Sequence, residues 1–326
     1  MKKEPVLIAP ALFFLDSSVL RAESRPHPIS PYWVLAIALL GISFAGPLVK
    51  LSRADPIAIA VWRLGIALLI VGVFLGATGQ WREFRRISRA DLLLASLGGV
   101  SLALHFWAWN ASVHLTTIAA SVTLVSLQPA VVAGISALLI REAPSLRQST
   151  GIAIAILGAL VIAVPDLTGG GAAGGSRPLL GNLLAISAAI TAGVYYTIGR
   201  RLRAHLGVWS YVAIVYGAAF VTLLVIGIAR GVTFAGQPPR EIAIFIGLAL
   251  LPTILGHTGM NWALKLLPAF VVNLTVLGEP VGATLLGALI PSIGEIPTVS
   301  TFIGGGVVLT GVIIATTGQR VTHSHE

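Results

Sequence analysis

The stretch 277-LGEPVGATLLGALI-290 places a glutamate directly before a proline, Glu279 and Pro280, inside an apolar run long enough to cross a membrane. A charge at the centre of a membrane-spanning helix costs roughly 3 kcal/mol on insertion scales. Pro280 also lacks a backbone N–H, so it cannot donate to the carbonyl of Val276. Both residues must therefore serve the packing of the helix, its function, or both.

The rest of the chain is equally apolar. Of its 326 residues, 56% are hydrophobic and 10% are charged, whereas soluble domains have about 45 to 50% and about 25%. A window of about 19 residues finds segments long enough to cross a roughly 30 Å hydrocarbon core. We count ten, at approximately 32–50, 56–78, 91–113, 117–140, 147–165, 179–199, 208–229, 241–264, 268–291 and 297–317. The sequence predicts an all-α integral membrane protein with ten transmembrane helices and no room for a soluble catalytic domain.

A near copy of the opening stretch lies 151 residues earlier, at 126-SLQPAVVAGISALL-139. Gln128 and Pro129 stand there in the places of the glutamate and the proline. The same offset pairs Asn110 with Asn261, one helix earlier in each copy. Equivalent positions that follow in the same order along the chain indicate an internal repeat.

Each copy holds five expected helices. The repeats are expected at 32–165 and 179–318, joined by a glycine-rich external linker at 166–178, with cytoplasmic tails at 1–31 and 319–326. Because five is an odd number, the two halves must have opposite orientations in the membrane. Inverted repeats with interrupted helices at matching places are typical of secondary transporters, whose site lies near the midplane.

The basic residues are sorted by loop. The chain carries a formal charge of +9, and 15 of its 21 Lys and Arg lie in the tails and the even-numbered loops, against 5 in the odd-numbered loops. This asymmetry predicts that both termini are cytoplasmic, in the inner (plasma) membrane. The densest basic segment is 82-REFRRISR-89. Anionic lipid headgroups, and not nucleic acid, are the expected partners of these arginines.

Four short motifs stand out in the sequence. The fourth helix of each half carries a proline followed by a terminal glutamate, seen as QP…RE142 and EP…GE295. Helix 2 carries 62-WR-63, and helix 8 carries 262-WAL-264. In these motifs the chain resembles the EamA-type members of the drug/metabolite transporter superfamily, over nearly its whole length. The resemblance implies ten helices in two inverted five-helix halves and identifies the substrate hardly at all.

Polar and aromatic side chains within the apolar helices are candidates for a central substrate cavity. Tyr195 continues a stripe with Ser187 and Thr191 on one helix, and His257 lies one turn before Asn261 on another. Single histidines in such helices are more often hydrogen-bonded structural groups than ligands. The candidate substrate-binding residues are His105, Trp109, Asn110, Gln128, Tyr195, His257, Asn261 and Glu279. Pro129 and Pro280 are expected to break their helices, and we expect no metal site.

Three roles remain open for Glu279. It could satisfy the opened helix by hydrogen bonding, contact a cationic group of the substrate, or carry a proton. Gln128 at the matching place cannot titrate, which weighs against the third role. Arg63 lies about seven residues into its helix, and we expect its side chain to extend to the outer interface.

The expected function is a secondary transporter that moves a small organic metabolite, amino acid-like or amphiphilic, outward by alternating access. The alternatives are a flippase for a lipid-linked or polyprenyl-linked sugar, and an intramembrane enzyme. The enzyme is disfavoured because the histidines form no HxxxH or HExxH pattern and the aspartates lie in loops or at span ends. We expect no cofactor. The pair Gly278 and Gly282 is a weak dimer motif, so a monomer or a weak homodimer is expected.

Overall fold

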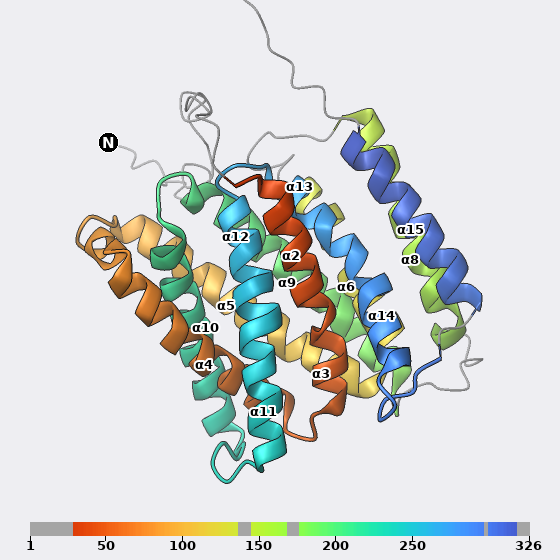
Figure 1. Ribbon diagram of the computed structural model, residues 1–326, viewed down its shortest axis with the longest axis horizontal. Coiled ribbons are helices and arrows are strands. Elements are labelled where there is room, and N and C mark those ends of the chain that lie inside the picture. Colours follow the sequence, from red (N-terminus) through yellow and green to blue (C-terminus); the bar gives the residue numbers. More distant parts are fainter. Residues whose placement is uncertain (1–28, 136–144, 168–175, 297–298, 318–326) are drawn as a thin grey trace, which may run out of the picture.

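The computed structural model describes residues 29–135, 145–167, 176–296 and 299–317, and all regular secondary structure in these ranges is helical (Figure 1). The two predicted tails, most of the glycine-rich linker and Glu142 lie outside the described residues. The helices of the first half are α2 (Pro31–Ser43), α3 (Ala45–Leu51), α4 (Pro56–Ala77), the 3₁₀-helix η2 (Gln80–Arg85), α5 (Arg89–Leu115), α6 (Ile118–Val125), α7 (Gln128–Ile135) and α8 (Leu146–Leu167).

The second half of the chain contains a π-helical stretch. Its elements are α9 (Pro178–Arg203), α10 (Val208–Ala229), α11 (Pro239–Leu248), the π-helix η4 (Ala249–Thr258), α12 (Gly259–Ala263), α13 (Ala269–Leu274), the 3₁₀-helix η5 (Thr275–Gly278), α14 (Glu279–Leu289) and α15 (Val299–Thr317). Elements α11, η4 and α12 form one continuous rod.

Seven helices in the described ranges are long and apolar enough to cross a membrane, which confirms an all-α membrane protein. They are Pro31–Leu51, Pro56–Ala77, Arg89–Leu115, Pro178–Arg203, Val208–Ala229, Pro239–Ala263 and Val271–Leu289. The other three expected spans, at 117–140, 147–165 and 297–317, contain the helices α6, α7, α8 and α15 but are not among these seven. The count of ten spans therefore stays a prediction.

Both predicted helix breaks are present. The chain leaves α6 at Val125 and begins α7 at Gln128, and it passes through η5 before α14 begins at Glu279. Pro129 and Pro280 thus stand in the first turn of a new helix, where a missing N–H removes no intrahelical bond. The Ser126 hydroxyl donates to the carbonyl of Val122 at 2.6 Å, and its Oγ also lies 3.4 Å from the carbonyl oxygen of Val276, which Pro280 leaves open. The two breaks therefore contact each other.

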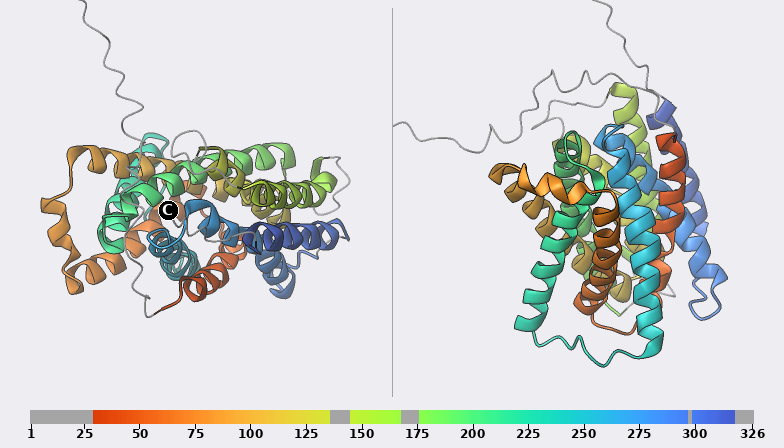
Figure 2. Two further views of the ribbon diagram at one scale, coloured as in Figure 1. Left: turned by 90° about the horizontal axis from the view of Figure 1, so that it is seen from above. Right: turned by 60° about the vertical axis from the view of Figure 1, so that its left-hand side comes forward.

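The helices form a bundle with a separate pair at one edge. Helices α8 and α15 run side by side at the right of Figure 1, and the view from above in Figure 2 shows the same pair. A Cβ atom on Gly311 would come within 2.6 Å of the carbonyl oxygen of Gly151, so the pair packs backbone to backbone. Helices α4 and α10 pack together at the opposite edge. The space between the two edges holds the candidate site.

Candidate functional site

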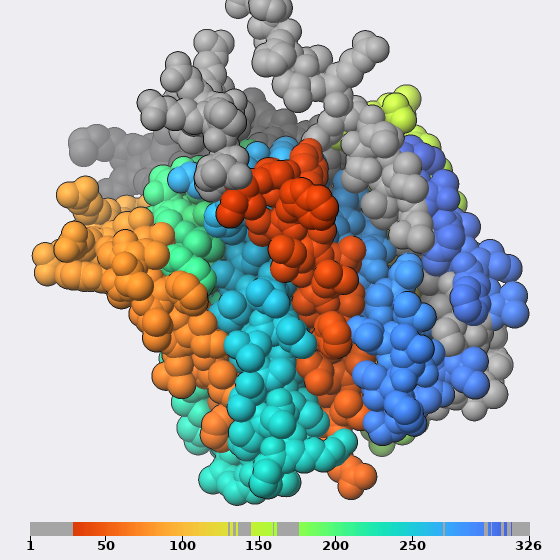
Figure 3. All heavy atoms as spheres, viewed as in Figure 1, coloured from red at the N-terminus to blue at the C-terminus, as the bar shows by residue number. Residues whose placement is uncertain are grey.

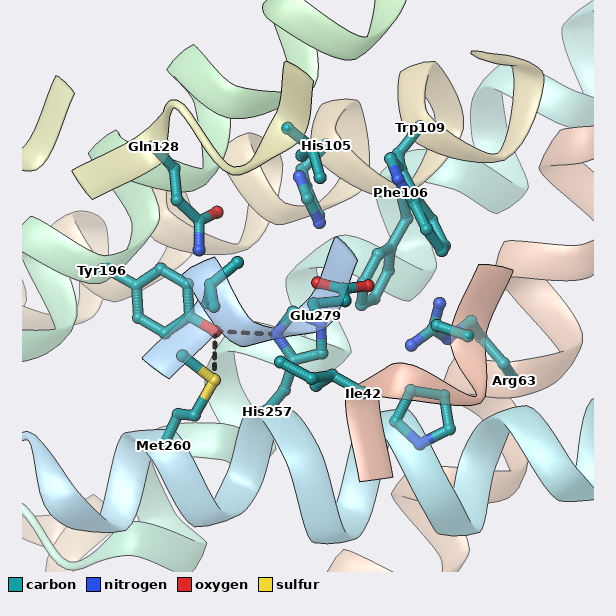
Figure 4. Close-up of a pocket in the computed structure, with 14 residues that line it drawn as sticks. Ile42, Arg63, His105, Phe106, Trp109, Gln128, Tyr196, His257, Met260 and Glu279 are labelled. Atoms are coloured by element: carbon teal, nitrogen blue, oxygen red, sulfur yellow. Dashed lines mark hydrogen bonds between the residues drawn. The ribbon is translucent and has the colours of Figure 1, made fainter. Parts of the chain in front are cut away.

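A buried cavity lies at the centre of the bundle, beside both helix breaks (Figure 4). Its volume is about 30 Å³, which suits one or two water molecules. Its lining combines five charged or ionisable side chains and one amide with apolar and aromatic ones: Ile42, Ala45, Arg63, His105, Phe106, Trp109, Val125, Gln128, Tyr196, Pro252, His257, Met260, Val276 and Glu279. The cavity in this conformation is therefore too small for an organic metabolite and must expand to take one.

The cavity brings together five of the eight residues predicted from the sequence: His105, Trp109, Gln128, His257 and Glu279. They come from four helical regions, namely α5, α7, η4 and α14. All five side chains are buried. Their convergence follows from the helix breaks, which turn the first residues of α7 and α14 toward the centre of the bundle.

The other three predicted residues do not line the cavity. Asn110 is not part of the lining, and it donates from Nδ2 to the carbonyl of Pro56 at 3.1 Å. Asn261 donates from Nδ2 to the carbonyl of His257 at 2.7 Å, and it is also hydrogen-bonded to the hydroxyl of Tyr195. Tyr195 and Asn261 therefore lie behind the cavity wall, where they support His257.

Arg63 is the main residue that the sequence reasoning placed wrongly. Its side chain does not extend to the interface, because it is only 1% exposed and it lines the cavity. Its Nε donates to Thr253 Oγ1 at 3.0 Å, and the guanidinium carbon lies 3.9 Å from the centre of the Phe106 ring. Among the described residues, Nη1 and Nη2 have no hydrogen-bond partner. Arg63 therefore has two donors available inside the cavity.

The π-helix η4 provides the contact that holds Arg63. Thr253 Oγ1 donates to the carbonyl of Leu248, five residues earlier, at 2.7 Å, so it is free to accept from Arg63. Pro252 lies within the π-helix and lines the cavity. Single π-turns occur often at functional sites, because they change which side chains face inward.

His257 and His105 lie on facing walls with their rings 6.0 Å apart. The Tyr196 hydroxyl is 3.2 Å from His257 Nδ1 and donates toward the sulfur of Met260 at 3.3 Å. His105 Nδ1 is 2.9 Å from the carbonyl of Ala188, so Nδ1 carries the proton and a neutral ring keeps Nε2 as an acceptor. Both histidines are hydrogen-bonded, as single histidines in helices usually are.

The Glu279 carboxylate is 7% exposed and shares the cavity with Arg63. Within the described part of the chain it has no hydrogen-bond or ion-pair partner closer than 4.0 Å. The open carbonyl of Val276 lies 3.4 Å from Ser126 Oγ, and among the described residues it has no hydrogen bond with the Glu279 side chain. The hypothesis that Glu279 satisfies the helix break thus finds no supporting contact, and the substrate and proton hypotheses remain.

The sequence reasoning missed several lining residues, among them Phe106, Tyr196 and Met260. Phe106 follows His105 directly, and Tyr196 follows Tyr195, so a small error in helix rotation decides which of two neighbours faces inward. The stripe of Ser187 and Thr191 does not reach the cavity. Both hydroxyls donate to carbonyls of their own helix, at 2.9 Å and 3.0 Å.

The chain is similar to several known proteins. Two curated proteins named as uncharacterized transporters are similar: one from Archaeoglobus fulgidus, 25% identical over 86% of this chain and 95% of its own length, and YdfC from Bacillus subtilis, 24% identical over 85% and 87%. A probable terminal-alkyne amino-acid exporter from Streptantibioticus cattleyicolor is 26% identical over 88% of this chain and 95% of its own. A solved structure aligns with a TM-score of 0.66 at 17% identity, covering 88% of this chain and 96% of the other.

A family profile covers most of the sequence. The profile described as the EamA-like transporter family matches residues 29–164 and again residues 179–317. These matches and the names of the relatives indicate a transporter and not an enzyme. The chain belongs to the EamA-like transporter family.

Proposed function

We propose that this protein exports a small zwitterionic metabolite of the amino-acid type by alternating access. One observation carries the proposal. Within the part of the chain that the structure describes, Arg63 has two unpartnered donor nitrogens and Glu279 has no hydrogen-bond or ion-pair partner, and both line the same buried cavity. A cation and an anion held apart in one cavity match a ligand that carries both charges.

The chemistry of the two charged groups fits an α-amino acid. A guanidinium group presents its N–H donors in a planar fork that matches a carboxylate. The Glu279 carboxylate can accept from an ammonium group. Leaving either charge buried without a partner is costly, so a ligand that satisfies both offsets that cost.

The remaining lining supplies an apolar compartment. Phe106, Trp109, Met260 and Ile42 offer aromatic and aliphatic surface for a substrate side chain. The indole Nε1 of Trp109 has no hydrogen-bond partner in the described residues, so it can donate to a polar substituent. The relative named as a terminal-alkyne amino-acid exporter supports a substrate with an amino-acid backbone and an apolar side chain.

Alternating access requires two halves that move against each other, and we propose that these are inverted repeats at 32–165 and 179–318. The separate profile matches to the two halves support this. The contacts also come in matched pairs. Helix α5 of the first half packs on α9, the first helix of the second half. In the same way, the rod that contains η4 in the second half packs on α2, the first helix of the first half. Helices α6 and α14 meet each other at the centre.

Two basic side chains, Lys50 and Arg200, make equivalent hydrogen bonds at opposite ends of the bundle. Lys50, at the end of α3, donates from Nζ to the carbonyl of Val113 at 3.2 Å. Arg200, near the end of α9, donates from Nη1 to the carbonyl of Leu264 at 2.7 Å. The two acceptors are 151 residues apart, the offset of the repeat. The cations therefore occupy equivalent places in the two proposed halves.

We propose that these contacts close the two ends of the cavity. At one end Lys50 Nζ also lies 3.1 Å from Glu295 Oε1, and Glu295 Oε2 accepts from the backbone N–H of Ile118 at 3.0 Å. At the other end Arg203 donates from Nε to the carbonyl of Asn261 at 2.9 Å. We assign the Glu295 end to the outside and the Arg203 end to the cytoplasm, in accord with the loop charges, with both termini cytoplasmic and the protein in the plasma membrane.

Transport into proteoliposomes tests the proposed function. Vesicles preloaded with a pool of apolar amino acids should take up labelled amino acid by exchange, and Arg63→Gln should abolish the uptake. Arg53→Gln is the matched control, because Arg53 is exposed at the Glu295 end. If wild-type vesicles exchange no amino acid but move a polyprenyl-linked sugar between leaflets, the flippase alternative replaces this proposal.

A further inference from the structure

The basic connection between α4 and α5 forms a pocket separate from the central cavity. The 3₁₀-helix η2 and the residue after it border an open surface pocket of about 350 Å³, lined by Trp81, Arg82, Glu83, Arg85 and Arg86. This part of the chain, drawn in orange at the left of Figure 3, projects from the side of the bundle. We propose that this pocket binds the phosphate headgroup of an anionic membrane lipid.

The segment is held in a fixed position against the first turn of α10. Gln80 Oε1 accepts from the N–H of Trp209 at 3.0 Å, and the carbonyl of Gln80 accepts from Ser210 Oγ at 2.9 Å. Glu83 Oε2 accepts from the N–H of Gly207 at 2.9 Å. Because these contacts use the neutral and acidic side chains of η2, they leave its arginines pointing outward.

The arginines themselves are not neutralised by the protein. Arg82, Arg85 and Arg86 are exposed, and in the described ranges none of their side chains forms a salt bridge or a hydrogen bond. The guanidinium groups of Arg82 and Arg85 lie 5.6 Å and 5.5 Å from the Trp81 ring centre. Both cations therefore lie near the same aromatic ring, and their N–H donors stay available for phosphate oxygens.

The aromatic residues place this pocket at the depth of lipid headgroups. Trp81 is 40% exposed and Phe84 is 41% exposed, as expected for side chains at the membrane interface. Directly before the segment, Phe74 stacks on Trp209 with ring centres 4.5 Å apart. The pocket thus lies where α4 ends and α10 begins, at the end of the bundle that we assign to the cytoplasm. A lipid is favoured over a soluble phosphate because the pocket adjoins these exposed apolar rings.

Native mass spectrometry of the full chain in detergent tests the proposal without any transport step. Phosphatidylglycerol should bind more tightly than phosphatidylcholine, and the triple variant Arg82→Gln/Arg85→Gln/Arg86→Gln should lose this preference. Each arginine near a membrane surface contributes about 1 kcal/mol toward anionic lipid, so each removal should weaken binding about fivefold. Trp81→Ala, which removes the ring under two guanidinium groups, should also weaken it.

The control variant is Arg53→Gln/Arg177→Gln/Arg230→Gln, which removes three exposed arginines at the other end of the bundle. It should bind phosphatidylglycerol like the wild type. Equal losses of phosphatidylglycerol binding in the two triple variants would overturn the proposed site, because they would show that the net charge of the protein alone attracts the lipid. If soluble glycerol phosphate bound as tightly as phosphatidylglycerol, the lipid assignment would be wrong. Because this experiment measures lipid binding and not transport, the lipid site can fail its test while the proposed transport function holds, and the reverse.

Discussion

The guanidinium carbon of Arg63 lies 3.9 Å from the centre of the Phe106 ring. The face of an aromatic ring attracts a cation without accepting a conventional hydrogen bond. The ring therefore fixes the plane of the guanidinium group while Thr253 accepts only from Nε. Nη1 and Nη2 remain available, and they are the basis of the predictions for substrate binding.

Arg63→Lys should bind a zwitterionic substrate about 30-fold more weakly than the wild type, although the charge is retained. A lysine ammonium is a point charge and cannot form two parallel hydrogen bonds to one carboxylate. The loss corresponds to roughly 2 kcal/mol. Equilibrium binding to the purified protein measures it, with Arg53→Lys as the control. Wild-type affinity in the Arg63 variant would refute the paired-donor contact.

Glu279→Gln should reduce affinity for an amino acid by about tenfold, or roughly 1.4 kcal/mol. Its affinity for the deaminated acid of the same skeleton should stay within about twofold, because that ligand has no ammonium group to contact the carboxylate. The same titration of both ligands gives the comparison. If the variant instead binds and exchanges both ligands normally but loses accumulation driven by a pH gradient, Glu279 is a proton carrier and not a substrate contact.

Glu295→Gln should open the cavity toward the outside, because it weakens the 3.1 Å ion pair with Lys50. The chain has no cysteine, so Ala45→Cys places a single thiol on the cavity wall. A membrane-impermeant maleimide added outside should label it faster in the Glu295 variant. Arg200→Gln should instead raise labelling from the cytoplasmic side. Reversed sides would contradict the proposed topology.

Gly41→Ala should destabilise the protein by about 1 to 3 kcal/mol, as overpacking does. A Cβ atom there would come within 2.6 Å of the carbonyl oxygen of Leu251 in the π-helix, and a backbone cannot move aside as a side chain can. Gly72→Ala is the matched control, since nothing lies within 4 Å of its Cβ position. Thermal unfolding in detergent should separate the two variants. Equal unfolding temperatures would mean that α2 and η4 are free to separate.

Much of the fold could be predicted because membrane helices follow directly from apolar length. The breaks at Pro129 and Pro280 could be predicted because proline acts through its own backbone. Gln128 and Glu279 were found for a related reason: a polar side chain beside a break is expensive unless it faces the centre of the bundle.

The remaining site depends on the rotation and the partners of each helix. Arg63 is close enough to a helix end for its side chain to reach the interface. Its burial depends instead on contacts with Thr253 and Phe106, which both lie far from it in the sequence. Pro252 marks an interruption of its helix, but it does not specify that residues 249–258 are π-helical. The sequence predicted Tyr195 as a lining residue, whereas Tyr196 lines the cavity. Neighbouring residues on a helix face different sides, so a small error in the expected rotation of the helix selects the wrong one of the two.

The account rests on Arg63 binding a substrate carboxylate, and calorimetric titration with an amino acid and with its amide tests this most directly. The amide retains the ammonium group and the side chain but lacks the carboxylate charge. The wild type should bind the amino acid at least about tenfold more tightly than the amide, and Arg63→Gln should bind the two ligands equally. If Arg63→Gln retains the full preference for the amino acid, or if the wild type shows none, Arg63 does not bind the carboxylate and the central claim is wrong.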